Sequence, residues 1–306
     1  MTEELVQMVV KYIVISGGAY NGLAALGATY HLQGRMFDID DIVGIYGSSV
    51  GALIGTLLAL RCDRTVLFDY IIKRPWHKTV DLTPNSLIQG VAAKGLFTIK
   101  FISSILVPLL ETADLSADIT LGAFFEATNI DLHLFTTRLN GISITDLSHT
   151  TFPDLSLLKA VHMSCTIPFL FQPLYIDGSY HVDGGVACHF PLSQCLDAGA
   201  SEGEILAVSI RVTGDQRTSL NEDTHILEYG LFLFQSLVDA RNAVNNVTIP
   251  NMLIVPSSGL DLDTGYKILS RPEERQKLID AGEEYARLFL LYKEETQGLK
   301  SGGDEF

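Results

Sequence analysis

Two short apolar runs, each ending in glycine and leading into a helical pattern, constrain the fold of this chain more than any other feature. Residues 12–15 (YIVI) lead into a glycine-rich loop, and residues 23–32 then place apolar side chains at helical spacing. Residues 42–46 form the next apolar run, and residues 50–61 predict a buried helix after it. Because alternating strands and helices are typical of α/β architecture, we predict a mainly parallel sheet.

The rest of the chain continues this pattern less regularly. We expect one domain over residues 11–292, between an N-terminal extension (1–10) and a polar, frayed tail (293–306), since no repeat, linker or composition break divides it. The apolar segment 82–110 predicts a helix packed on the body, with a mobile lid as the alternative. Further strands are expected at 132–137, 141–144, 174–176, 179–182 and 204–212, and further helices at 155–163, 224–242 and 272–291.

Composition excludes several classes of partner. The chain has 306 residues, of which 47 % are hydrophobic and 19 % charged, so it can bury a large core. Its net charge of −15 argues against nucleic acid, which is bound by clustered lysine and arginine. It also argues against membrane binding through a polybasic patch. Any contact with lipid should therefore be mainly hydrophobic.

The cysteines and the first residues of the chain indicate in which cellular compartment the protein is expected. Cys62, Cys165, Cys188 and Cys195 show no CxxC pair and no metal-ligand spacing, so we expect free thiols in a reducing compartment and no metal site. The first residues do not have the pattern of a signal peptide. The longest apolar run, 50–60, is shorter than the roughly 20 residues that span a bilayer. We expect a cytoplasmic protein, with peripheral contact at membranes left open.

Residues 47–51 (GSSVG) match G-x-S-x-G, centred on Ser49. In a strand–turn–helix context, Gly47 and Gly51 leave room for a sharp turn that exposes the serine hydroxyl. Such a hydroxyl needs a base within reach and donors for the oxyanion, and the backbone N–H of Val50 is placed to be one donor. The alternative is a glycine-rich turn in which Ser49 merely caps the helix.

A second glycine loop, 16–22 (SGGAYNG), follows the first predicted strand. It lacks G-x-G-x-x-G and the phosphate-binding G-x-x-x-x-G-K-S/T, so a nucleotide site is not supported. The backbone N–H groups of Gly17, Gly18 and Ala19 could instead point at an oxyanion.

The proton acceptor is less clear from the residues alone. The candidate histidines, none of them in a marking motif, are His162, His181, His189 and His225. Asp183 ends a predicted hairpin strand and precedes Gly184 and Gly185, which would let the backbone bend closely around its carboxylate. Asp-Gly is also a common turn sequence, and spacing alone favours that interpretation.

Taken together, the glycine loop, the Ser49 motif and Asp183-Gly184-Gly185 resemble the patatin-like phospholipases. Residues 164–173 (SCTIPFLFQP) are also similar to the stretch that precedes the aspartate in that family. The resemblance runs from about residue 11 to about residue 215 and more weakly into the last helix. It implies a three-layer α/β/α fold with the nucleophile on an elbow between a strand and a buried helix.

The resemblance also implies a mechanism: Ser49 attacks an ester, Asp183 accepts its proton, and no metal or cofactor is needed. The implied substrates are glycerophospholipids or other acyl esters. Two positions depart from the family pattern, since Ala19 replaces a glycine and Asn21, before Gly22, replaces an Arg or Lys. Asn21 could donate a neutral hydrogen bond in place of that cation. A weakened member that binds lipid or a protein partner and a Ser-His-Asp esterase remain alternatives, and the oligomeric state is left open.

Overall fold

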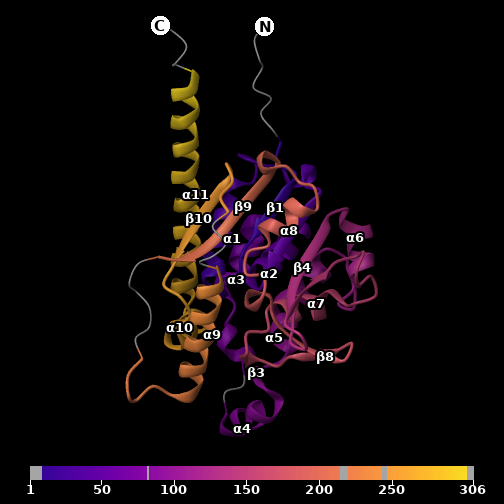
Figure 1. Ribbon diagram of the computed structural model, residues 1–306, viewed down its shortest axis with the longest axis vertical. Helices are drawn as coiled ribbons and strands as arrows, with labels where there is room; N and C mark the ends of the chain where they lie inside the picture. Colours follow the sequence, from indigo (N-terminus) through magenta and orange to yellow (C-terminus); the bar gives the residue numbers. More distant parts are fainter. Residues whose placement is uncertain (1–8, 81–82, 214–219, 243–246, 302–306) are drawn as a thin grey trace.

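The computed structural model describes residues 9–80, 83–213, 220–242 and 247–301 (Figure 1). A central sheet is formed by strands in the order β10-β9-β1-β2-β4-β8-β7, with β5 also paired to β4. The strands from β10 to β4 run parallel, whereas β8, β7 and β5 are antiparallel additions. The sheet strands are β1 (Tyr12–Ile15), β2 (Gly44–Ser48), β4 (Asp131–Arg138), β5 (Ser143–Leu147), β7 (Leu174–Ile176), β8 (Ser179–Asp183), β9 (Ile205–Val212) and β10 (Met252–Ser257).

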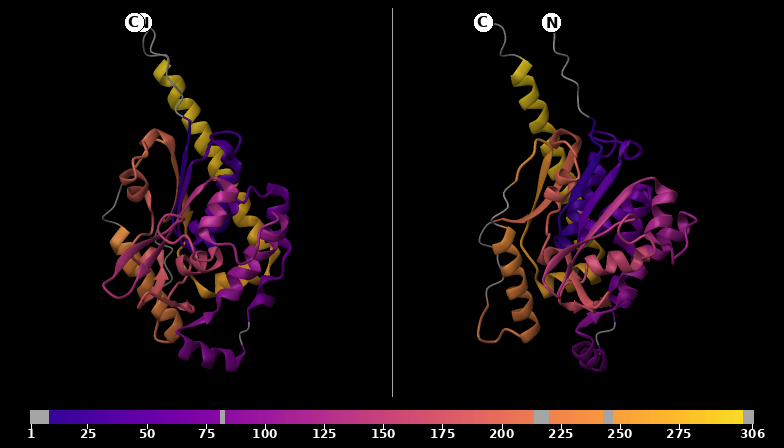
Figure 2. Two further views of the ribbon diagram at one scale, coloured as in Figure 1. Left: turned by 90° about the vertical axis from the view of Figure 1, so that its right-hand side faces the viewer. Right: turned by 45° about the vertical axis from the view of Figure 1, so that its right-hand side comes forward.

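Helices flank this sheet, which confirms the predicted α/β class. They are α1 (Gly22–Leu32), α2 (Val50–Ala59), α3 (Arg64–Lys73), α4 (Pro84–Ala93), α5 (Ile99–Thr112), α6 (Leu121–Thr128), α7 (Leu157–Ser164), α8 (Leu192–Asp197), α9 (Ile226–Asn242), α10 (Leu262–Ser270) and α11 (Pro272–Ser301). Both views in Figure 2 show α11 (yellow) projecting beyond the body, on the side where the two chain ends lie. Within the described ranges, no helix combines the length and apolar character needed to span a bilayer.

Alternation along the strands builds a core on each face of the sheet. Ile13, Ile15 and Ile45 are fully buried in the main core, which they share with α1, α2, α5 and α7. Val14 and Tyr46 point to the other face, where the smaller core includes side chains of α8. The strands of the sheet are therefore covered on both sides, and their loops at one end are left to form a site.

Two predicted segments have a different structure. Residues 82–110 are not one helix but α4, a short strand β3 (Gly95–Phe97) and α5. β3 pairs in parallel with β6 (Phe169–Phe171), and a side chain on Gly95 would overlap the backbone of Phe171. Local periodicity does not report such a pairing between distant segments. Residues 81–82 lie outside the described ranges.

The tail also departs from its prediction. Helix α11 continues through Ser301 instead of fraying after residue 292. Lys293 contributes to this, because its ammonium donates to the Asn251 side-chain oxygen at 2.7 Å and to the Pro250 carbonyl at 3.2 Å. The remaining tail residues, 302–306, and most of the N-terminal extension, 1–8, lie outside the described ranges.

Candidate active site

Ser49 lies at a sharp turn between β2 and α2, with φ of 56° and ψ of −126°. This is a strained conformation for a residue with a side chain. The flanking glycines make the turn possible, since a side chain on Gly51 would overlap the carbonyl oxygens of Ile15 and Ser16. A side chain on Gly47 would likewise overlap the backbone of Gly51. The motif thus forms the close strand-to-helix elbow that its glycines predict.

The Ser49 hydroxyl donates to the Asp183 carboxylate, with 2.6 Å between Oγ and Oδ2. Ser49 makes no side-chain capping bond to α2, so it is not acting as a helix cap. The two residues are 134 positions apart in sequence. The structure therefore brings together the nucleophile and the carboxylate that the resemblance implies, and both side chains are almost fully buried, at 4 % and 3 % exposure.

Hydrogen bonds hold Asp183 through its carboxylate, its backbone N–H and its backbone carbonyl. Its second carboxylate oxygen accepts the Gly185 N–H at 2.8 Å, and its backbone N–H donates to the Thr166 carbonyl at 2.7 Å. The Thr137 hydroxyl donates to its backbone carbonyl at 2.9 Å. Burial raises the pKa of Asp183 to about 6, although the bonds from Ser49 and Gly185 act in the opposite direction. A carboxyl with this pKa can exchange a proton near neutral pH.

Gly184, the next residue, is required by the crowding beside Asp183. A side chain there would overlap the Phe135 carbonyl oxygen and the Ser48 hydroxyl. In contrast, the other Asp-Gly pair, Asp177-Gly178, lies in the exposed turn between β7 and β8. The second glycine, Gly185, already distinguishes the Asp183 pair in the sequence, and the two pairs also differ in their surroundings.

Two residues at the C-terminal end of α7, Ser164 and Cys165, support the elbow, and neither has a role predicted from the sequence. The Ser49 N–H donates to the Ser164 hydroxyl at 2.9 Å, and that hydroxyl donates to the Phe135 carbonyl at 2.6 Å. The Cys165 thiol lies 3.0 Å from the Ser49 carbonyl oxygen and donates to it. The signal was present, since both residues open the segment 164–173 that resembles the family, but their contacts depend on the folded chain.

One predicted oxyanion donor, the Gly17 N–H, is already hydrogen-bonded. The Gly17 N–H donates to the His189 carbonyl at 2.9 Å, so it is not free to bind an oxyanion as predicted. Among the described residues, the N–H groups of Gly18, Ala19 and Val50 have no hydrogen-bond partner. Three of the four predicted donors thus remain. Ala19 has a φ of 48°, a left-handed conformation that costs about 1 kcal/mol for a residue with a Cβ.

Asn21 does not stand in for the missing cation at the oxyanion position. Its amide instead lies 3.4 Å from the Gly259 carbonyl oxygen, toward which it donates. Gly22 allows α1 to approach the elbow, because a side chain there would overlap the Val50 side chain. The loop is therefore packed directly against the start of α2.

No candidate histidine hydrogen-bonds to Ser49 or Asp183 within the described residues. The His162 ring contacts the Gln172 carbonyl at 2.8 Å, His181 is buried on β8, and His225 is exposed before α9. His189 is nearest to Ser49: a Cβ on Gly17 would lie 3.0 Å from its Nδ1 and 3.3 Å from the Ser49 Cβ. Burial lowers its pKa, so its ring is neutral near pH 7.

Two cavities meet at Ser49. One, of about 530 Å³, is lined almost entirely by apolar side chains of α2, α5 and the β6 region, among them Leu53 and Phe101. The other, of about 500 Å³, contains Asp183, His189 and polar side chains of β9 and α9. An ester whose carbonyl lies at Ser49 would have an apolar space on one side and a polar space on the other.

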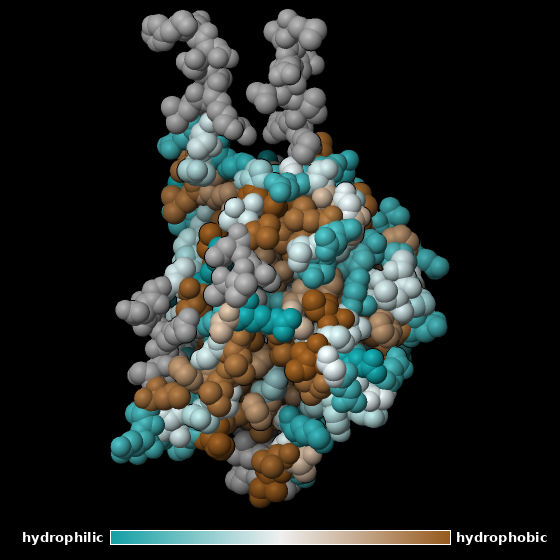
Figure 3. Space-filling model, viewed as in Figure 1, coloured by the Kyte–Doolittle hydropathy of each residue, from teal (hydrophilic) through white to brown (hydrophobic). Residues whose placement is uncertain are grey.

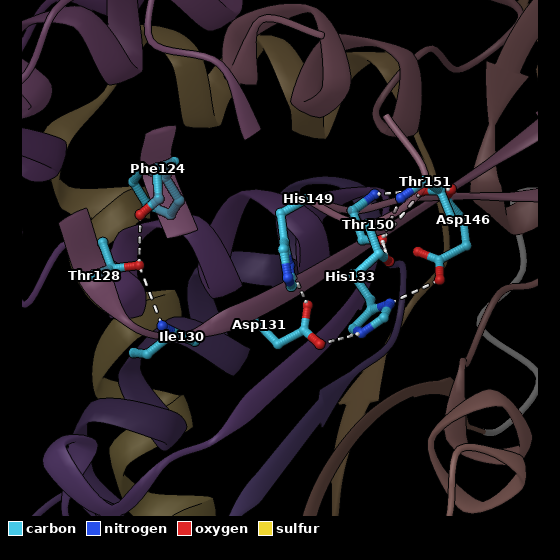
Figure 4. A network of polar contacts seen from close by, with 10 residues as sticks. Phe124, Thr128, Ile130, Asp131, His133, Asp146, His149, Thr150 and Thr151 are labelled. Atoms are coloured by element: carbon cyan, nitrogen blue, oxygen red, sulfur yellow. Dashed lines mark hydrogen bonds and ion pairs between the residues drawn. The ribbon is translucent and has the colours of Figure 1, made fainter. Parts of the chain in front are cut away.

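A second cluster of titratable groups lies at the opposite end of β4 (Figure 4). His133 contacts Asp146 at 2.7 Å and Asp131 at 3.2 Å, and Asp131 also contacts His149 at 3.0 Å. Burial by itself would lower the pKa of His133, but the two carboxylates outweigh it and raise the pKa to about 9. No group of His, Cys, Asp and Glu in the described ranges could hold a metal ion. This cluster ties β4 to β5 and the following turn, away from Ser49.

Two curated proteins illustrate what this chain is similar to. The "Probable lipid hydrolase 463L" of Invertebrate iridescent virus 6 is 29 % identical over 184 residues, which cover 60 % of this chain but only 62 % of that relative. The "Uncharacterized protein YqhO" of Bacillus subtilis (strain 168) is 25 % identical over 296 residues, or 90 % of this chain and 97 % of the relative.

A solved structure supports the fold alone. VipD from Legionella pneumophila matches with a TM-score of 0.53 at 18 % identity, over 92 % of this chain and 66 % of VipD. The family model described as "Patatin-like phospholipase" matches residues 13–196, which is more than half of the chain and includes the elbow, the glycine loop and Asp183. This chain therefore belongs to the patatin-like phospholipase family.

Proposed function

We propose that this chain is a lipid acyl hydrolase that cleaves fatty acyl esters with Ser49 as nucleophile and Asp183 as general base. The observation that carries the proposal is the direct 2.6 Å hydrogen bond between Ser49 Oγ and Asp183 Oδ2 on a strained elbow. Nothing stands between hydroxyl and carboxylate, so the proton can pass directly between them.

The reaction then proceeds in two steps. Ser49 Oγ attacks the ester carbonyl carbon as its proton moves to Asp183, and the resulting oxyanion is stabilised by the N–H groups of Gly18, Ala19 and Val50. The tetrahedral intermediate collapses, the alcohol leaves with the proton from Asp183, and an acyl-serine remains. Asp183 then takes a proton from water, the water oxygen attacks the acyl carbonyl, and the fatty acid is released as Ser49 regains its proton.

The apolar cavity supports a fatty acyl group as the part bound during this cycle. Its lining joins Ser49 itself to the apolar face of α2, through Val50, Leu53 and Leu57. Burying an alkyl chain there contributes about 0.8 kcal/mol per methylene group. A long acyl chain would therefore be bound much more tightly than an acetyl group.

We also propose that the enzyme contacts a lipid surface through α9. Its inner face packs on the small core around Ile167 and Leu170, yet its outer face is apolar as well. We call that outer face the α9 surface, formed by Ile226, Tyr229, Leu233 and Leu237, which are 84, 45, 44 and 71 % exposed. Figure 3 shows hydrophobic side chains gathered over the lower half of this face, where Figure 1 places α9. The α9 residue Leu227 also lines the apolar cavity, which links this surface to the site.

Labelling by a fluorophosphonate probe tests the proposed function. We expect stoichiometric labelling of the wild type, none in Ser49→Ala, and labelling slower by about 100-fold or more in Asp183→Asn, since a general base contributes at least that much. Ser48→Ala is a matched control, because this neighbouring hydroxyl is buried in the same elbow without a hydrogen-bond partner among the described residues.

Other outcomes would contradict the proposal in distinct ways. A folded wild type that is not labelled would favour a lipid- or protein-binding role. Labelling that requires one of His162, His181, His189 or His225 would favour a Ser-His-Asp esterase instead.

A further inference from the structure

The two cavities at Ser49 divide a bound ester into halves of different chemistry. Ser49, Ala19, Ile167 and Leu260 line both of them, so the boundary lies at the nucleophile. If the acyl half occupies the apolar cavity, the alcohol half must extend toward the polar one. The polar cavity therefore holds the side chains that distinguish one alcohol half from another.

Two arginines from different elements line the polar cavity: Arg211 on β9 and Arg241 in the last turn of α9. Arg211 donates to the Ser209 hydroxyl at 3.1 Å and lies 3.3 Å from the Met252 sulfur, both uncharged groups. Within the described residues, neither guanidinium forms an ion pair. As far as the described part of the chain goes, both cations are therefore available to a ligand, in a protein of net charge −15.

The other charged residues in the described lining of the cavity are two carboxylates, Asp183 and Asp239. Asp183 is committed to Ser49 and Gly185. Asp239 also lines the cavity, and it accepts a hydrogen bond from the Gln235 amide at 2.8 Å. With Asp183 set aside as the base, the described lining of the cavity has two cations and one carboxylate. An anion is the charged group that fits this balance.

Resting on the hydrolase function proposed above, we propose that Arg211 and Arg241 bind the phosphate of a glycerophospholipid and so select phospholipids over neutral acylglycerols. A guanidinium group suits this role, because its planar donors match phosphate oxygens and it stays charged at any working pH. The two residues are specificity-determining and lie outside the Ser49–Asp183 pair.

Non-cleavable ligands test this proposal independently of catalysis. Binding of a short-chain diether phosphatidylcholine and of the matching dialkylglycerol is measured by calorimetry on the wild type, Arg211→Gln and Arg241→Gln. Since a hydrogen bond to a charged group is worth about 1.5–3 kcal/mol, each variant should bind the phospholipid about 10-fold or more weakly and the dialkylglycerol unchanged. Arg287→Gln is the matched control, because this exposed arginine on α11 lies outside both cavities.

Each outcome separates the alternatives. Equal affinity of the wild type for the two diethers, or equal losses for both in the variants, would overturn the proposal. The proposal would also be overturned if inorganic phosphate bound through these arginines while the two diethers bound equally well. The arginines would then form a site for free phosphate and not for a phospholipid. Arg211→Lys, which keeps a cation beside Ser209, guards against a folding defect in Arg211→Gln. Fluorophosphonate labelling of the same samples reports separately on the hydrolase function.

Discussion

At the scale of single residues, Asp183 titrates in the range usually assigned to histidine. Burial raises its pKa to about 6, against the effect of the hydrogen bonds from Ser49 and Gly185. A pH–activity profile falls on its acid side when a catalytic base becomes protonated. Such a fall (the acid limb) near pH 6 would ordinarily be attributed to the imidazole of a histidine. Under the function proposed above a carboxylate would produce the same fall, so the pH profile must be combined with a histidine variant to be informative.

The first prediction concerns this limb. General-base catalysis needs ionised Asp183, so kcat/KM for a soluble ester should fall as the pH drops through about 6. His189→Gln should keep the limb, because His189 has no hydrogen bond to Ser49 or Asp183. The measurement is kcat/KM from pH 4 to 9 in both proteins. A limb that disappears in His189→Gln would assign it to the imidazole.

The second prediction concerns stability and His133. Its pKa is about 9 in the folded state, against 6.5 ordinarily, so its charge stabilises the fold fully below pH 6.5. That contribution should be lost as the pH rises through about 9. The wild type should exceed His133→Gln in free energy of unfolding by a margin that shrinks by up to about 3 kcal/mol over this window.

Urea unfolding at pH 6 and pH 10 measures this margin. His225→Gln serves as the control, because His225 is exposed and lies outside the cluster. A margin that stays constant with pH would show that His133 is not charged between its two carboxylates.

At the scale of elements, α1 and α11 are in close backbone contact through glycines. A side chain on Gly282 of α11 would overlap the Ala24 carbonyl, and one on Gly27 of α1 would overlap the Ile279 carbonyl. Contact this close buries both helices against each other and anchors the C-terminal helix to the helix that follows the oxyanion loop. Glycine is used here for space, in spite of its poor helix propensity.

The third prediction tests this contact. Gly282→Ala should lower the free energy of unfolding by about 1–3 kcal/mol, the usual cost of overpacking. Gly265→Ala in α10 is the matched control: its added methyl would be 3.7 Å from Tyr20, so better helix propensity should stabilise the protein by up to about 1 kcal/mol. Chemical denaturation measures both. Equal effects of the two substitutions would show that the helices can separate without cost.

At the scale of the whole molecule, an acidic protein presents an apolar face close to its site. The net charge of −15 disfavours attraction to anionic membranes, so the proposed lipid contact depends on the α9 surface. Exposed Ile88 and Val91 of α4, at 73 and 83 %, are further apolar side chains in the described part of the chain. Such contact would be strongest on neutral vesicles.

The fourth prediction follows from this surface. Leu237→Glu and Ile226→Glu should lower hydrolysis of neutral phospholipid vesicles by about 10-fold each, since burial of such a side chain is worth about 1.5–3 kcal/mol. Hydrolysis of a short-chain soluble ester should not change. Val66→Glu, at an exposed position of α3, provides the control. If vesicle activity were equal in all of these proteins, α9 would not be the face that meets lipid.

Local patterns were sufficient for most elements of this fold. The apolar runs of residues 12–15 and 42–46, their following glycines and the helical patterns after them predicted β1, α1, β2 and α2 in the observed order, because each of these segments is buried and apolar. The prediction of a single helix over residues 82–110 was wrong, because β3 forms only by pairing with β6. A strand of this length is held by its partner and leaves little trace in its own residues.

The sequence by itself determined the elbow at Ser49, because Gly47 and Gly51 are the residues that allow a strand to turn sharply into a helix. It also determined the α/β class. The family resemblance also pointed to Asp183. Only the tertiary structure decided that the Ser49 hydroxyl donates directly to Asp183, that Gly17 gives its N–H to His189, and that Arg211 and Arg241 share a cavity. The reason is physical: turn geometry and periodicity are local properties of the chain, whereas hydrogen bonds, burial and pKa arise between segments that folding alone brings together.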